Sequence, residues 1–275
     1  MLKLLRADFR RLLRSKAFTV PAAIMLIAGI LMPVIHYIDL GGTPGLSFDL
    51  YFSDYTVVAV ILLAVFASLF IGTEYSDGTI RNKLIAGHSR ANIYLSELVV
   101  CLAAGVIMCA AYAGAYLAVG LPLLGDFSGG AKQMLLVILA SFAMQAAFAA
   151  LFTLIAMLCH SKAHTSVICI LLAIVLFASG IFIANRLSEP EYYSAYSTSI
   201  NGEVIEEQGI ANPSYIRGTQ RQVYSFLYDY LPGCQTIRLF ALDKFDAGTF
   251  VMWDALTFAL ASCVGVLAFR KKDIK

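Results

Sequence analysis

Charged side chains are scarce in this sequence of 275 residues. Asp, Glu, Lys and Arg make up 14% of it, against roughly 25% in soluble globular proteins, while 60% of its residues are hydrophobic. This composition excludes a soluble enzyme or binding module and predicts a protein of the lipid bilayer. Five segments free of these four residue types approach or exceed the roughly 18 residues of a spanning helix. They are residues 17–38, 55–73, 98–125, 133–160 and 163–185; a sixth, 247–269, contains Asp254.

A phosphate-binding loop is also missing. The nearest candidate combines Gly125, Gly130 and Lys132, but Ala131 follows the second glycine and no Ser or Thr follows the lysine, so the motif fails. No segment outside the spans is long enough for a nucleotide-binding domain. We therefore expect no cofactor on this chain, and any work done with ATP and Mg²⁺ requires a partner polypeptide.

The cysteines and histidines give no framework for a disulfide or a metal. Five of the six cysteines lie in or beside predicted spans, where packing is their usual role. Cys234 lies outside them and is either a free thiol or a bridge across a symmetric dimer. His160 and His164 are four residues apart, but only Cys159 is near enough in sequence to add a ligand, so we predict no metal site.

The Lys and Arg residues are distributed unevenly between the predicted loops. Of the 20, 14 lie in the N-terminal segment, the loop 72–95, the turn after the fourth span and the C-terminal tail. The positive-inside rule makes that side cytoplasmic, with both termini inside. Residues 1–16 form an amphipathic pattern that predicts an interfacial helix with its arginines toward anionic head groups. The apolar arc of this helix contains Leu2, Leu5, Phe9, Leu12 and Leu13.

The loop 72–95 is a polar segment between two predicted spans and contains a short helical pattern. Ile80, Leu84 and Ile85 fall on one face, and Gly87 ends the pattern. Ser89 is a candidate N-cap for the next helix. A short amphipathic helix held at both ends by membrane spans is suited to docking in a groove of another protein. The alternative is a solvated connector without a special role.

The order of residues in this loop resembles permease subunits of the type-2 ABC exporter family. The resemblance rests on about twenty residues, with the motif positions Glu74, Gly78, Thr79, Ile80, Arg81, Leu84, Ser89 and Arg90. It implies that the loop is a coupling helix for two copies of a separate ATP-binding cassette subunit. It also implies a second permease copy, the same or related. Under this hypothesis, salt bridges of Glu74 and Arg81 orient the helix, and Ile80 with Leu84 fills the partner's groove.

Residues 186–246 form the longest predicted outer segment, rich in tyrosine. Val223, Phe226, Leu227, Tyr230 and Leu231 make an apolar stripe that Pro232 and Gly233 stop. The stripe lies on the outer leaflet, pairs with its twin in a dimer, or lines an exit for an amphipathic cargo. The candidate contacts are Tyr224, Phe226, Leu227 and Tyr230.

Asp254 in the sixth span is a candidate intramembrane polar site, because ionisable groups there are costly. The alternative is that a neighbouring hydroxyl group forms a hydrogen bond with it.

These observations predict an all-α membrane protein of the bacterial cell membrane with six transmembrane helices. Its parts are an interfacial helix (1–16), five spans with the coupling loop (17–185), an extracellular cap (186–246) and a sixth span with a basic tail (247–275). The expected function is the permease subunit of an ATP-driven exporter, itself not an enzyme, that moves an amphipathic or hydrophobic substrate such as a peptide. The alternatives are a proton-coupled secondary carrier and a non-transporting sensor or structural subunit. No nucleic-acid partner is expected.

Overall fold

The computed structural model describes residues 1–41, 52–127, 129–159, 161–193, 197–200, 203–206, 209–241 and 246–273. Within these residues, six helices are long and apolar enough to cross a membrane, which confirms the predicted fold class. They are α2 (Lys16–Asp39), α4 (Tyr55–Ser76), α6 (Arg90–Leu124), α7 (Gly130–Leu158), α8 (Lys162–Ser188) and α11 (Ala247–Lys271). His160, considered above as a ligand, lies outside the described residues.

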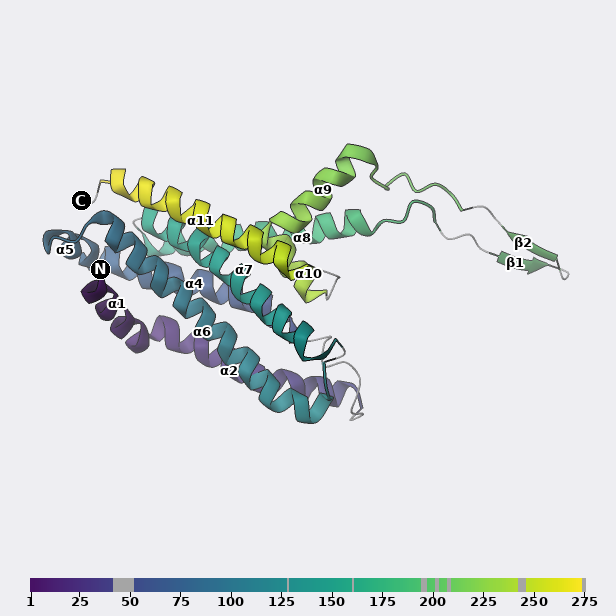
Figure 1. Cartoon of the computed structure of the whole chain (residues 1–275), viewed down its shortest axis with the longest axis horizontal. Helices are drawn as coiled ribbons and strands as arrows, with labels where there is room; N and C mark the ends of the chain where they lie inside the picture. Colours follow the sequence, from purple (N-terminus) through teal and green to yellow (C-terminus); the bar gives the residue numbers. More distant parts are fainter. Residues whose placement is uncertain are drawn as a thin grey trace.

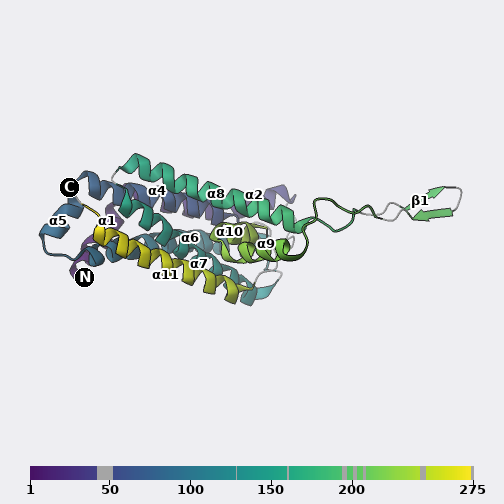
Figure 2. The same ribbon diagram turned by 90° about the horizontal axis from the view of Figure 1, so that it is seen from above.

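The shorter elements gather at the two ends of this bundle. At one end lie α1 (Leu2–Arg14), α5 (Thr79–Ile85) and both chain termini (Figure 1). Toward the other end lie α9 (Gly218–Tyr230), α10 (Pro232–Phe240) and an antiparallel hairpin of β1 (Ser197–Ile200) and β2 (Glu203–Glu206). The view from above shows the same division (Figure 2). The hairpin was not among the elements that the sequence predicted.

Helix α4 forms the centre of the bundle. It contacts α2, α6, α7 and α8, and its buried residues include Leu63, Phe66 and Phe70. The outer helices α2 and α8 instead expose many large aliphatic side chains, as expected for surfaces that face lipid tails. The element that follows α4 in sequence is therefore attached to the most enclosed helix of the protein.

Helix α10 packs against the bundle and is not a freely exposed part of the segment 186–246. It contacts α8, α7 and α4, and a Cβ atom on Gly233 would lie 2.3 Å from the carbonyl oxygen of Leu176. This approach requires a residue without a side chain. Cys234 is fully buried and is a free cysteine; burial raises the pKa of its thiol to about 12. A bridge across a dimer would therefore require Cys234 to leave its buried position.

Candidate functional site: the charged cluster behind helix α5

Helix α5 is a seven-residue helix delimited by two glycines. Gly78 precedes it with φ of 69°, and Gly87 follows it with φ of 85°, a backbone conformation that residues with a Cβ rarely adopt. The amide of Gly87 donates to the carbonyl of Leu84 at 3.0 Å. Ser89 then caps α6, because its side chain accepts from the amide of Asn92 at 3.3 Å. The predicted helix end at Gly87 and the predicted N-cap at Ser89 are both confirmed.

The two faces of α5 differ in what covers them. Ile80 is 1% exposed and belongs to the core of its own chain, and Leu84 packs against that core. Arg81 and Ile85 are exposed, the latter at 74%. The expectation that Ile80 fills a partner's groove is therefore wrong for this conformation, because the core of its own chain already encloses Ile80.

Lys83 lies on the inward face and is surrounded by carboxylates. Its Nζ donates to Asp8 at 2.9 Å, to both carboxylate oxygens of Glu74 at 2.6 and 2.8 Å, and to Glu97 at 2.8 Å. These three acids come from α1, α4 and α6 and are at most 2% exposed. A single ammonium group thus connects α5 to three other helices.

Arg11 of α1 supplies the second cation of this cluster. Its guanidinium pairs with Glu74 and with Glu97, and it lies 3.6 Å from the centre of the Phe70 ring. Two cations therefore face three carboxyl groups in a buried region. Burial alone lowers the pKa of Lys83, but the carboxylates of Glu97, Glu74 and Asp8 outweigh burial, so the pKa lies above its ordinary value. Lys83 is charged at physiological pH.

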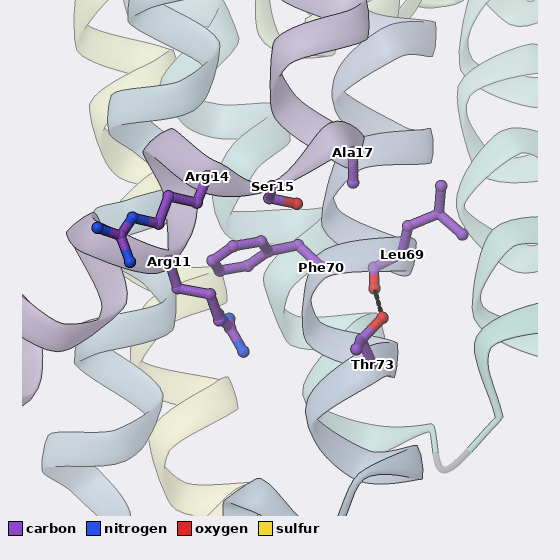
Figure 3. A pocket seen from close by; sticks show the side chains of 7 residues that line it. All are labelled: Arg11, Arg14, Ser15, Ala17, Leu69, Phe70 and Thr73. Atoms are coloured by element: carbon purple, nitrogen blue, oxygen red, sulfur yellow. Dashed lines mark hydrogen bonds between the residues drawn. The ribbon is translucent and has the colours of Figure 1, made fainter.

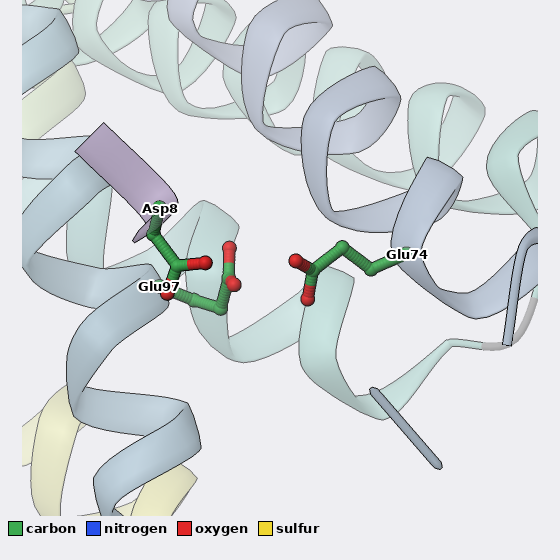
Figure 4. Close-up of side chains that lie close together, drawn as sticks. All are labelled: Asp8, Glu74 and Glu97. Carbon is green, nitrogen blue, oxygen red and sulfur yellow. The ribbon is translucent and has the colours of Figure 1, made fainter. Parts of the chain in front are cut away.

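The three carboxylates also lie close enough together to coordinate a metal ion. One oxygen of each can be chosen so that all lie within 4.8 Å of one another (Figure 4). The ammonium of Lys83, however, already binds all three acids at hydrogen-bond distance. The lysine takes the place that a cation would need, so we assign this cluster to structural ion pairing.

A cavity of about 210 Å³ lies beside Arg11, at the corner between α1 and α2 (Figure 3). The corner is formed by Ser15, whose backbone is extended between the two helices. The hydroxyl of Thr73, also in the wall, donates to the carbonyl of Leu69 at 2.6 Å. The corner between α1 and α2 is therefore incompletely packed against α4.

Two residues were expected to orient α5 by salt bridges, and they differ in outcome. Glu74 pairs with Lys83 and Arg11, whereas Arg81 forms no ion pair with any residue that the structure describes. Arg90 does hold the start of α6: its guanidinium donates to the carbonyl oxygens of Phe269 and Lys272 at the end of α11. Thr79 is the first residue of α5.

The comparison with protein-family models places the chain in a family. The model described as "ABC-2 family transporter protein" matches residues 4–180, which is more than half of the chain. The chain belongs to the ABC-2 family of transporter proteins. A search of curated proteins found no match. ABC-2 proteins are membrane subunits of transporters and normally partner an ATP-binding cassette subunit.

The predicted outer residues of this ABC-2 protein lie on α9 and pack against its own chain. Phe226 stacks on Tyr230 with ring centres 5.7 Å apart, and both rings meet Trp253 of α11 edge-on at 5.6 and 5.2 Å. Tyr224 and Leu227 pack against a small cluster around Ile183. Half of the Phe226 side chain stays exposed. The stripe is therefore only partly covered within one copy.

The residues that sequence reasoning missed are Asp8, Arg11, Lys83 and Glu97. Glu97 gave the clearest signal, since it is a carboxylate one residue before a predicted span. The structure starts the same helix at Arg90 and buries Glu97 completely. A buried acid needs a cationic partner, and this requirement could have directed attention to Lys83.

Proposed function

We propose that this chain is the membrane subunit of an ATP-driven exporter and that α5 receives the force of a separate ATP-binding cassette subunit. The observation that carries the proposal is the contact of Lys83 with Asp8, Glu74 and Glu97. A push on α5 would reach α1, α4 and α6 through that one ammonium group. Helix α4 would respond with the least slack, since only Asp77 and Gly78 separate it from α5.

The docking surface follows from the exposed face of α5. Arg81, Asn82, Ile85 and Ala86 are all exposed, and Ile85 offers the apolar contact that Ile80 cannot. Gly78 and Gly87 set the angle of the helix, while Leu84 anchors it to the core. A partner groove would accept Ile85 and surround it with polar contacts.

The proposed orientation places α5 and both termini in the cytoplasm of a bacterial cell. The charge asymmetry of the sequence supports it, and the gathering of α1, α5 and both termini at one end of the bundle agrees with it (Figure 1). Leu2 and Leu13 are exposed on α1, which suits a helix lying in the inner interface. The working assembly contains two permease copies and two ATPase subunits, which hold ATP and Mg²⁺.

The proposed cargo is an amphipathic or hydrophobic compound such as a peptide. The half-exposed aromatic side chains of α9, at the opposite end from α5, support this class. Aromatic rings that are buried on one side and exposed to water on the other suit contact with an amphipathic molecule as it leaves a bilayer.

The decisive experiment is to replace Ile85 with Asp. Wild-type protein purified from its native membrane should carry a stoichiometric ATP-binding cassette subunit, and Ile85→Asp should lose most of it because a charge would enter the apolar contact. Ile210→Asp is a matched control, since Ile210 is also 74% exposed but follows the hairpin at the other end. An equal amount of ATPase with both variants would refute the assignment of α5. A wild-type protein without an ATPase would refute the exporter.

A further inference from the structure

Asp254 is a buried carboxylate for which the described part of the chain offers no partner. It lies in α11 and is 1% exposed. Neither of its oxygens has a hydrogen-bond partner among the described residues, and the hydroxyl of Thr257, one turn along the helix, also has none. A neighbouring hydroxyl therefore does not satisfy it. Because unpaired polar groups in an apolar environment are costly whether or not they are charged, this arrangement requires an explanation.

A cavity of about 220 Å³ lies directly beside Asp254. Apart from Asp254 its wall is apolar, and three helices contribute to it: Leu102 of α6, Ala143 and Ala146 of α7, and Val251, Ala255 and Phe258 of α11. Val251 and Ala255 are exposed at the surface of the bundle, so the cavity borders the face that meets lipid. A cavity of about 150 Å³ can already hold benzene, so this one admits a compact ring or cage.

We propose that this cavity binds a lipophilic amine whose ammonium group turns the Asp254 carboxylate, enclosed in the present conformation, toward the cavity, with the apolar body of the amine against α6, α7 and α11. An ammonium group carries three N–H donors and the opposite charge, so it satisfies both oxygens of the acid. An anion would be repelled by the carboxylate. A metal ion would find one carboxylate and no further ligand in this wall. The alanines at 143 and 146 leave the space that the apolar body needs.

This proposal does not depend on the transport function. Binding is a property of a cavity within one copy of the chain and requires neither ATP nor the ATPase subunit. The two hypotheses can therefore fail separately.

The test is equilibrium binding of radiolabelled adamantan-1-amine to the full chain in lipid nanodiscs. We expect saturable binding that unlabelled amine displaces and that the neutral isostere adamantan-1-ol displaces far less effectively. Asp254→Asn should weaken amine binding by at least about tenfold, because a desolvated charge pair loses one member. Asp246→Asn is the matched control: this acid caps the same helix through the amides of Gly248 and Thr249, and the variant should bind as wild type does.

A second variant keeps the test valid if Asp254→Asn does not fold. Ala143→Phe fills the cavity without touching the charge and should abolish binding of the amine. Nanodiscs with and without phosphatidylethanolamine distinguish two natural ligands. If the ligand is a lipid headgroup, phosphatidylethanolamine should weaken binding of the probe; if it is a free amine, the lipid composition should not matter. Absence of saturable binding, equal displacement by the alcohol, or unchanged affinity in a folded Asp254→Asn would overturn the proposal. Equal displacement would mean that the cavity does not recognise the charge of the amine.

Discussion

The two ends of this bundle are held together by different physical means. At the end with α5, the contacts are ionic: Lys83 and Arg11 meet three buried carboxylates. At the other end, α10 approaches α8 so closely that Gly233 and Gly180 have no room for a side chain, and aromatic rings join α9 to α11. Ion pairs in a buried cluster depend strongly on every member, whereas close packing depends on shape. The first arrangement suits a joint that transmits force, and the second suits a rigid support.

The largest expected effect is at the ionic end. Lys83→Met keeps the apolar stem of the side chain but removes the ammonium group, so Arg11, which pairs with Glu74 and Glu97, is the one cation left in the cluster. Removing one partner of a buried ion pair costs about 3–5 kcal/mol, and we expect a loss of this size in the free energy of unfolding, measured by denaturant titration in detergent micelles. Lys132→Met, the same change at an exposed residue, should stay within about 0.5 kcal/mol of wild type. A loss below about 1 kcal/mol for Lys83→Met would mean that the cluster does not hold the helices together.

The packed end should respond to one added methyl group. Gly233→Ala places a Cβ atom 2.3 Å from the carbonyl oxygen of Leu176 and 2.6 Å from its Cβ, so α10 must move away from α8. Overpacking of this kind costs about 1–3 kcal/mol, measured by the same titration. Gly114→Ala is the control, because a Cβ atom there meets nothing within 4 Å and alanine favours the helix by about 0.5–1 kcal/mol. If both variants had the same stability, close packing would not be what joins α10 to the bundle.

The fold was largely predictable from the sequence, because the signals for its helices lie within single segments. Apolar runs of spanning length are a property of each segment alone, and the signals at Gly87 and Ser89 act within one turn of helix. Ser89 marked the start of α6 correctly, but the run free of charged residues begins only at Leu98, so Glu97 fell outside both the predicted loop and the predicted span. That charge is tolerated because Lys83 and Arg11 both pair with it, which no local rule detects.

The charged cluster could not be predicted, because it joins residues far apart in the sequence. Asp8 and Lys83 are separated by 75 positions, and each alone resembles an ordinary charge at the edge of a membrane span. The predicted apolar face of α5 was only partly right, because Ile80 and Leu84 turn toward the core while Ile85 is exposed and Lys83 lies on the inward face; periodicity does not show what covers such a face. The structure covers Ile80 with its own core, which moves the proposed docking surface to Ile85. The cavity beside Asp254 is likewise formed by three helices, so no local pattern predicts it.

The smallest expected effect is on the pH dependence of stability, in which Lys272 and Lys83 at the ionic end should differ. Lys272 donates to the hydroxyl of Tyr75 at 2.9 Å and to the carbonyls of Met157 and Cys159 at 2.8 and 3.3 Å. Burial lowers the pKa of Lys272 from 10.5 to about 8. The unfolded chain therefore holds this proton up to about pH 10.5 while the folded chain releases it from about pH 8, and the free energy of unfolding should rise with pH across that window. Lys83, whose pKa is raised by its carboxylates, keeps its proton in the folded chain throughout this window and so contributes nothing to the rise.

Lys272→Gln removes the titrating group and should flatten that rise, measured as the difference in unfolding free energy from wild type between pH 8 and pH 10. Lys132→Gln makes the same change at an exposed residue and is the control. The tyrosines and cysteines that titrate in this range are present in all three proteins, so their contribution cancels in the difference. The difference should be small, because Lys272 is only partly buried and water screens its charge. If the unfolding free energy of wild type and of Lys272→Gln had the same slope with pH, burial among neutral carbonyl groups would not lower the pKa of Lys272. The sites of Lys272 and Lys83 would then differ in the arrangement of their acceptors but not in how strongly each site favours a charged lysine.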